Sequence, residues 1–162
     1  MDFCTFHRIN DDLTQVTYED KMKLTYESEP RQEDIDFLSQ GISEYAYLKK
    51  GQQPIETFAF FMRDTGELII GGCNGSMYYG CLYIDQLWVD ERYRKQGIGK
   101  QLVEASECLG KEKKCRFSTI NTMDWEALGF YQKLGYEVEF QRDGYEHHST
   151  LYFLIKEFNN AA

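Results

Sequence analysis

The sequence predicts an α/β fold built around a mixed β-sheet, and three observations lead to this prediction. The strand pattern of residues 82–89 passes through a glycine-containing loop into a helical pattern at residues 98–109. Residues 55–73 hold two apolar, alternating runs around a short polar turn, as an antiparallel hairpin does. Strand and helix patterns then continue to residue 158. Antiparallel hairpins joined to strand–helix–strand units give a mixed sheet.

The N-terminal part of the chain divides into an extension and the first two predicted elements. Residues 1–20 are polar without a clear period, and we predict either a tail or a strand on the sheet edge. The folded domain is predicted to cover residues 21–162, and its first strand is the alternating run Lys21–Glu27. A helix follows from Ser28-Glu29-Pro30, with proline near its first turn, and ends near Gly51.

The middle of the chain is predicted to form an antiparallel meander. Ile55–Arg63 is its first strand, and Leu68–Cys73 is the partner strand across a tight turn that contains glycine. Asn74-Gly75-Ser76 is a second turn signal. It leads into a long strand from Tyr78 to Val89, which is followed by the loop and its helix.

The C-terminal third is predicted to complete the sheet. A short strand is expected around Cys115–Ile120, and a second short helix is expected from Asp124 to Leu134. Gly135–Phe140 alternates as a strand, and His148–Phe158 alternates as the last strand after a polar turn.

Composition and charge limit the classes of protein to which the chain can belong. With 162 residues, 42% of them hydrophobic, the chain is long and apolar enough to bury the core of one domain. The formal net charge of −9 argues against a nucleic-acid partner, because phosphate recognition needs a basic surface. No apolar run approaches the ~20 residues of a membrane span, and the N-terminus lacks a secretory pattern. We therefore expect a cytoplasmic protein with no membrane partner.

The number and spacing of the cysteines indicate free thiols and argue against disulfides or a metal site. Five are present, an odd number, and no two of them form a Cys-x-x-Cys pair. A disulfide framework and a cysteine metal site both need paired spacings, so we predict neither, and we predict no metal.

The loop between the long strand and its helix is the first candidate site. A strand that enters a helix through Gly97 and Gly99 directs free backbone N–H groups and the positive end of the helix dipole at one place. Phosphate is the anion that such a place suits best. Two phosphate motifs are excluded. Arg94 and Gln101 stand where a Walker loop needs glycine and Ser or Thr, and Leu102 stands where a dinucleotide fingerprint needs glycine.

Two patterns in this chain resemble the GCN5-related N-acetyltransferase (GNAT) superfamily. The loop matches the family's acyl-CoA-binding pattern through Arg94-x-x-Gly97-x-Gly99. Downstream, Ala127, Tyr131 and Gly135-Tyr136 match the family's second pattern at the right spacing. Asp124 stands where that pattern usually has Asn, so nearby Asn121 or Thr122 could supply the expected polar contact to the pantetheine arm.

This resemblance implies the single-domain acyl-CoA N-acyltransferase fold, a mixed and mostly antiparallel central sheet flanked by helices. It also implies acetyl-CoA as the co-substrate. The implied cofactor-binding residues lie on the strand end, on the loop and near the second pattern: Leu87, Trp88, Val89, Arg94, Lys95, Gln96, Gly97, Ile98, Gly99, Lys100, Asn121 and Asp124. Arg92 joins the loop cations expected to serve the CoA phosphates, although each of these cations could instead be a solvated surface charge.

Transfer of an acyl group to an amine sets the requirements for the catalytic residues. The amine must lose its proton, because its reference pKa is about 10.4, and the leaving thiolate must gain one. Tyr131 resembles the family's proton donor, and the oxyanion donors are expected on the backbone around Trp88 and Val89. Alternation places Asp85 on the face of Leu87 and Val89, where it could act as the base.

These roles have alternatives in the sequence. Tyr131 could be a packing residue of an apolar helix face, and Asp85 could be a solvent-edge carboxylate. Glu137, Asp143, His147 and His148 are weaker candidates for the base.

The function predicted is transfer of an acetyl group from acetyl-CoA to a small cationic amine by direct attack through a tetrahedral intermediate. Two alternatives stay open: acetylation of protein lysines or N-termini, and a CoA-binding sensor module without turnover. No cysteine lies in residues 82–89 of the strand before the loop, in the loop or in the Tyr131 helix, so no covalent route is expected. The resemblance further implies a homodimer paired through the last strands.

Overall fold

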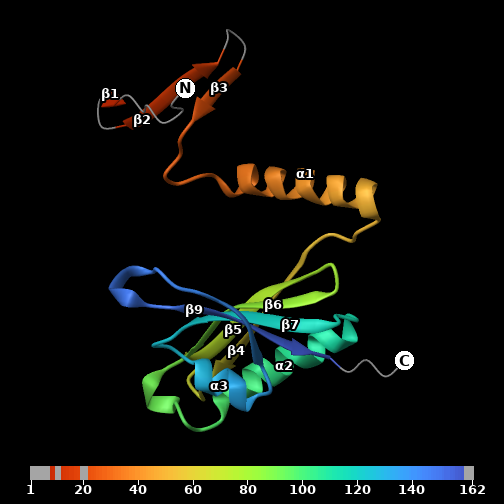
Figure 1. The fold of residues 1–162 in the computed structure, drawn as a ribbon, viewed down its shortest axis with the longest axis vertical. Coiled ribbons are helices and arrows are strands. Elements are labelled where there is room, and N and C mark those ends of the chain that lie inside the picture. Colours follow the sequence, from red (N-terminus) through yellow and green to blue (C-terminus); the bar gives the residue numbers. More distant parts are fainter. Residues whose placement is uncertain (1–7, 10–11, 19–21, 159–162) are drawn as a thin grey trace. The chain divides into compact units, whose positions relative to one another are not determined.

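The computed structural model describes residues 8–9, 12–18 and 22–158 (Figure 1). The chain divides into two compact units, residues 1–42 and residues 43–162.

The first unit contains a small antiparallel sheet in the order β1-β2-β3. Its strands are β1 (Arg8–Ile9), β2 (Asp12–Tyr18) and β3 (Met22–Thr25). The strand predicted at Lys21–Glu27 is therefore found as β3, whereas the described part of residues 1–20 contributes β1 and β2 to this separate sheet. Residues 1–7, 10–11 and 19–20 lie outside the described residues.

Helix α1 (Gln32–Lys50) begins in the first unit and continues into the second. Its first turn is tied by Arg31, whose guanidinium donates to both carboxylate oxygens of Asp34 at 2.9 and 3.0 Å. The helix ends at Gly51, which has a φ of +65° and donates its N–H to the Tyr47 carbonyl. A left-handed glycine at this position is a common helix stop, so the predicted end of the helix is confirmed.

The second unit holds a six-stranded sheet in the order β4-β5-β6-β7-β9-β8 (Figure 1). Its strands are β4 (Glu56–Arg63), β5 (Ile69–Tyr78), β6 (Cys81–Val89), β7 (Phe117–Met123), β8 (Glu137–Arg142) and β9 (Leu151–Glu157). Only β6 and β7 pair in parallel. The predicted fold class, a mixed and mostly antiparallel sheet flanked by helices, is confirmed.

The turn predicted at Asn74-Gly75-Ser76 is wrong. Strand β5 continues through these residues, and the chain reverses at Tyr79 and Gly80, whose φ angles are +53° and +87°. A Cβ atom on Gly75 would lie 2.0 Å from the Tyr83 carbonyl oxygen, which no side chain could tolerate. This glycine therefore allows a close approach between two paired strands, and it does not form a turn.

The core of the second unit lies between the sheet and two helices, α2 (Ile98–Glu112) and α3 (Leu128–Lys133) (Figure 1). Leu82 and Ile84 of β6 are fully buried against Val103 of α2, together with Leu154 of β9. The sequence pattern places these apolar side chains on one face of each element, so their burial excludes water from the layer.

Helix α3 starts later than the predicted helix Asp124–Leu134. Residues 124–127 form a turn, in which Glu126 accepts the Met123 N–H at 2.8 Å and the Thr122 hydroxyl at 3.2 Å. Thr122 Oγ1 in turn accepts the Ala127 N–H at 3.2 Å. Because these side chains take up the backbone groups that would begin a helix, α3 opens at Leu128 and its position is fixed to the end of β7.

Three smaller findings complete the fold. Cys73, Cys81, Cys108 and Cys115 form no disulfide bond with one another, and Cys4 lies outside the described residues. His147 and His148, expected at the start of the last strand, lie instead in a short 3-10 helix (Glu146–His148) ahead of β9. Among the described helices, none has the length and apolar character needed to cross a membrane.

Candidate active site

The loop after β6 leads into α2 through two residues with positive φ angles, Lys95 and Gly97. Lys95 has a φ of +62°, and Gly97 precedes α2 with φ 84° and ψ −1°. The Gln101 N–H donates to the Gly97 carbonyl at 3.0 Å as the first helical hydrogen bond. The N–H groups of Ile98, Gly99 and Lys100 therefore lie ahead of the helical ladder, at the positive end of the dipole.

Gly99 is needed for packing. A Cβ atom at this position would lie 3.3 Å from Phe130 of α3 and 3.7 Å from Val89 of β6. The glycine thus lets the first turn of α2 approach both the strand end and α3. This contact places three elements around one space.

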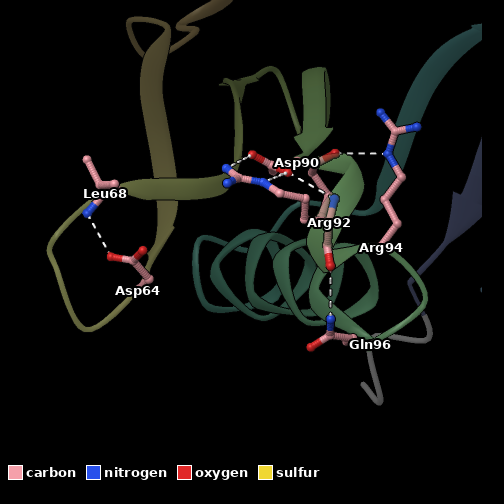
Figure 2. Close-up of polar contacts among 7 residues, drawn as sticks. Asp64, Leu68, Asp90, Arg92, Arg94 and Gln96 are labelled. Atoms are coloured by element: carbon pink, nitrogen blue, oxygen red, sulfur yellow. Dashed lines mark hydrogen bonds and ion pairs between the residues drawn. The ribbon is translucent and has the colours of Figure 1, made fainter.

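Polar contacts fold the loop back onto the end of β6 (Figure 2). Arg94 Nε donates to the Val89 carbonyl at 3.0 Å, and Gln96 donates to the Arg92 carbonyl at 3.3 Å. Arg92 itself holds the Asp90 carboxylate at 2.7 Å. This hydrogen bond lowers the pKa of Asp90 to about 2. Arg92, expected from the sequence to serve phosphate groups, is therefore a structural partner of Asp90 and lies outside the cavity described next.

A cavity of about 600 Å³ lies between the strand end, the loop and α3, and is called here the loop cavity. Trp88, Arg94, Lys95 and Lys100 are among its lining side chains. The predicted residues that line it are Leu87, Trp88, Val89, Arg94, Lys95, Gly97, Ile98, Gly99, Lys100 and Tyr131. Gln96 is not among them, because its side chain turns to the Arg92 carbonyl.

A second cavity of about 360 Å³, the gap cavity, lies where β6 and β7 separate. The two strands pair from Cys81 with Phe117 to Ile84 with Ile120, and no pairing between them is described beyond this point. Asp85 and Asn121 line the gap on opposite strands, and Tyr131 lines both this cavity and the loop cavity. The structure therefore brings the two predicted catalytic residues to one space.

The prediction that Asp85 lies on the same face as Leu87 and Val89 is wrong, because the strand is irregular at Asp85. Asn74 pairs with Gln86 and Gly75 pairs with Ile84, so Asp85 is an extra residue in β6. Such a bulge interrupts the alternation of side chains, and it places Leu87 and Val89 on the core side with Ile84. Asp85 stands where the alternation breaks. It is exposed and accepts a long hydrogen bond from the Tyr83 hydroxyl at 3.4 Å.

Backbone groups of β6 also face the gap. The Asp90 N–H donates to the Ile70 carbonyl of β5 at 2.9 Å. Because backbone groups alternate in direction along an antiparallel strand, Trp88 directs its N–H toward β5, whereas Leu87 and Val89 direct theirs away from it. The N–H groups of Leu87 and Val89 are thus the ones that point to the side left open by β7.

Tyr131 is buried, with 5% of its surface exposed, and packs edge-on against Phe130 and Tyr136. Burial raises the pKa of its hydroxyl, and the nearby Cys73 and Glu126 contribute in the same direction. The phenol therefore stays protonated well above neutral pH. A group of this kind can donate a hydrogen bond or a proton to a developing anion.

Asp124 is not brought to either cavity. It lines a separate cavity with Trp125, Tyr145 and His147. Thr122, which the sequence offered as an alternative for the missing polar contact, lines the gap cavity beside Asn121.

Sequence reasoning missed several lining residues. Tyr93, Trp125 and Phe130 line the loop cavity, and Glu126 lines both cavities. Ala127 also lines both, and its place in the second pattern was the one signal that could have indicated it. No group of His, Cys, Asp and Glu side chains in the described part of the chain is arranged to hold a metal ion.

The fold and the loop define an acyltransferase class of site, and comparison with known proteins gives the family. The model of the acetyltransferase (GNAT) family matches residues 14–136. The chain therefore belongs to this family, and the family and enzyme class predicted from the two patterns are confirmed.

Three relatives show how far the similarity extends. Blasticidin-S acetyltransferase of Streptomyces morookaense is 35% identical over 107 residues, which cover 65% of this chain and 78% of that protein. The crystal structure of an acetyltransferase from Bacillus cereus is 27% identical, with a TM-score of 0.68, covering 83% of this chain and 98% of that one. The crystal structure of a protein described as a streptothricin acetyltransferase from Bacillus anthracis was solved with acetyl coenzyme A. It is 19% identical, with a TM-score of 0.59, and the similarity covers 85% of this chain and 75% of that one. This last similarity shows a shared fold.

Proposed function

We propose that this protein transfers an acetyl group from acetyl-CoA to a primary amine of a small cationic substrate. The observation that supports this most directly is the meeting of the loop cavity and the gap cavity at Tyr131. One cavity offers cations and helix N–H groups for phosphates, and the other offers a carboxylate for an amine. An acyl donor and an amine acceptor need such adjoining sites.

The loop cavity fits the CoA part of acetyl-CoA. Arg94, Lys95 and Lys100 surround the free N–H groups of the first turn of α2, an arrangement that suits a pyrophosphate. The apolar side chains of Leu87, Val89 and Phe130 line the same cavity and suit the pantetheine arm. Asn121 lies on the far side of the gap, where its amide can contact that arm.

The gap cavity fits the reacting groups. Asp85 accepts a proton from the amine, and the neutral nitrogen then forms a bond to the thioester carbonyl carbon. The N–H groups of Leu87 and Val89 stabilise the resulting oxyanion, because they point to the gap without a strand partner there among the described residues. As the carbon–sulfur bond breaks, Tyr131 donates its hydroxyl proton to the thiolate, and the second proton of the attacking nitrogen, which is lost as the amide forms, returns to the tyrosinate. No covalent acyl-enzyme is formed on this route.

The proposed substrate is a small amine rather than a protein. Its support is the 35% identity to a protein named for acetylation of blasticidin S. The net charge of −9 also favours a cationic acceptor over an anionic one.

Release of CoA thiol and the mass of the product test this proposal. Acetyl-CoA is incubated with the protein and with polyamines, aminoglycosides, blasticidin S, amino acids or lysine peptides. We expect thiol release with a small amine and a product heavier by one acetyl group. Efficient release with peptides alone would favour protein acetylation. Tight acetyl-CoA binding, measured as a rise in melting temperature, with no release from any amine would favour the sensor alternative.

A further inference from the structure

A third cavity lies beside the gap cavity, between β4, β5 and β6, and is called here the acceptor cavity. Its volume is about 550 Å³, and its polar lining comes from Thr57, Asn74, Ser76, Tyr83 and Asp85. Each side chain lies on a strand of the second unit, so the cavity is formed by rigid elements.

Asp85 connects the acceptor cavity to the gap cavity. Among the residues that line these two spaces, it is the one that they share. This double position follows from the bulge, because the extra residue of β6 is not held to either face of the sheet. A molecule in the acceptor cavity can therefore place one nitrogen at Asp85 while the rest of it extends along β5.

Asn74 has a polar atom left without a partner at this place. Its Nδ2 donates to Gln86 Oε1 at 2.9 Å. Its Oδ1 is buried and has no hydrogen-bond partner, which is the one such side-chain atom found among the described residues. Buried amide oxygens are nearly always hydrogen-bonded in folded proteins, and Asn74 is one of the residues that line the acceptor cavity, so a ligand bound there can supply the missing donor.

The remaining groups favour a ligand rich in N–H donors. Asp85 offers acceptors only, and the Tyr83 hydroxyl already donates to its carboxylate at 3.4 Å. Ser76 and Thr57 can accept as well as donate. An acceptor-lined space of this kind suits an ammonium or guanidinium group and disfavours a carboxylate.

We propose that Asn74 is a specificity-determining residue, whose amide oxygen receives a second nitrogen group of the acceptor while the reacting amine lies at Asp85. The substrate class is thus an amine that bears a second ammonium or guanidinium group. This inference rests on the proposed function for the identity of the acceptor, but the binding site itself can be tested without turnover.

Equilibrium binding of amines, measured by calorimetry with and without free CoA and in the absence of acetyl-CoA, tests it. The probes are a series of linear diamines and agmatine, each compared with the linear monoamine of the same chain length. The variants are Asn74→Leu, which removes the oxygen at similar size, and Asn74→Asp, which keeps an acceptor. Gln141→Leu, on the exposed strand β8, is the matched control for replacing an amide with an aliphatic side chain.

The wild type is expected to bind at least one diamine or agmatine more tightly, by about tenfold or more, than the monoamine of the same length. A site that accepts a hydrogen bond from a second nitrogen group discriminates against a ligand that lacks this group. Asn74→Leu is expected to lose this preference, whereas Asn74→Asp and Gln141→Leu keep it. Absence of a preference in the wild type, or a preference that survives in Asn74→Leu, would overturn the inference. Failure of the proposed function is seen separately, as binding without any acetyl transfer.

Discussion

Arg94 Nε donates to the Val89 carbonyl at 3.0 Å, so the loop closes over the end of the strand that it follows. The contact fixes one nitrogen of the guanidinium and leaves its other donors beside the loop cavity, which Arg94 also lines. Arg94 therefore both holds the loop and offers charge to a phosphate.

Replacement of Arg94 by Gln is expected to weaken acetyl-CoA binding. A hydrogen bond to a charged group contributes ~1.5–3 kcal/mol, so the dissociation constant should rise by roughly ten- to a hundredfold. Isothermal titration with acetyl-CoA measures this. Arg142→Gln is the control, because Arg142 lies against the Phe140 and Phe153 rings of β8 and β9. Equal effects of the two substitutions would show that general charge, and not the loop site, governs binding.

Gly97→Ala tests the backbone conformation at the start of α2. Its φ of +84° is strained for any residue with a Cβ, so we expect a loss of about 1–2 kcal/mol in the free energy of unfolding. Gly129→Ala, in α3, is the matched control, because a Cβ there meets no atom within 4 Å and its φ is not positive. Chemical denaturation should show the control to be neutral or stabilised by about 0.5–1 kcal/mol. A stable Gly97→Ala variant would contradict the assigned loop conformation.

The partly buried ion pair between α2 and β9 gives a stability prediction. Lys156 Nζ donates to both carboxylate oxygens of Glu107 at 2.8 and 2.7 Å, and Glu107 is 4% exposed. Removing Lys156 leaves the Glu107 charge buried and unpaired, so Lys156→Met should cost ~3–5 kcal/mol. Glu107→Leu should cost less, because Lys156 is partly exposed to water.

The double variant Glu107→Leu with Lys156→Met is the informative comparison for this pair. Two apolar side chains of similar size remove both charges, so its stability should lie much closer to that of the wild type. Denaturant unfolding of all four proteins measures the coupling. If the double variant lost the sum of the two single losses, the charges would not be partners.

The pH dependence of stability should report the Asp90–Arg92 pair. The folded-state pKa of Asp90 is about 2, below its ordinary value of 3.8. A depressed carboxyl pKa stabilises the fold above the unfolded value, and this stabilisation disappears as the pH falls through the folded value. The difference in melting temperature between wild type and Asp90→Asn should therefore persist from pH 7 to about pH 4 and vanish toward about pH 2. A difference that did not change over this range would exclude Asp90 as its source.

Much of the fold could be predicted from the sequence because local patterns determine it. Ile55–Arg63 and Gly135–Phe140 alternate clearly and are found as β4 and β8 within two residues at each end. Gly97 and Gly99 indicated the loop, because the lack of a Cβ allows the positive φ of Gly97 and the close packing of Gly99. Such signals lie within a few residues of one another in the chain.

What could not be predicted depends on contacts between distant residues. Asn74-Gly75-Ser76 has the composition of a turn, but its close pairing with Tyr83 and Gln86 holds it in a strand. The bulge at Asp85 is likewise set by the register of β5 against β6, which no pattern in β6 reveals. The acceptor cavity combines side chains of three strands, so no single motif could indicate Asn74.

The role proposed for Tyr131 is donation of a proton to the leaving thiolate, and a comparison with Tyr136 tests this role. The Tyr136 hydroxyl lies 2.8 Å from the Ser118 hydroxyl in the core, and Tyr136 lines neither the loop cavity nor the gap cavity. No hydrogen bond to the Tyr131 hydroxyl is found within the described residues. The same change from Tyr to Phe should therefore affect activity at one position and stability at the other.

The decisive measurement is kcat for acetyl-CoA-dependent thiol release by Tyr131→Phe and Tyr136→Phe, with the free energy of unfolding measured beside it. Tyr131→Phe is expected to reduce kcat by about a hundredfold or more with little loss of stability. Tyr136→Phe is expected to keep kcat and to lose ~1–3 kcal/mol, because Ser118 is left with an unmet hydrogen bond. A Tyr131→Phe enzyme with wild-type kcat would contradict the account.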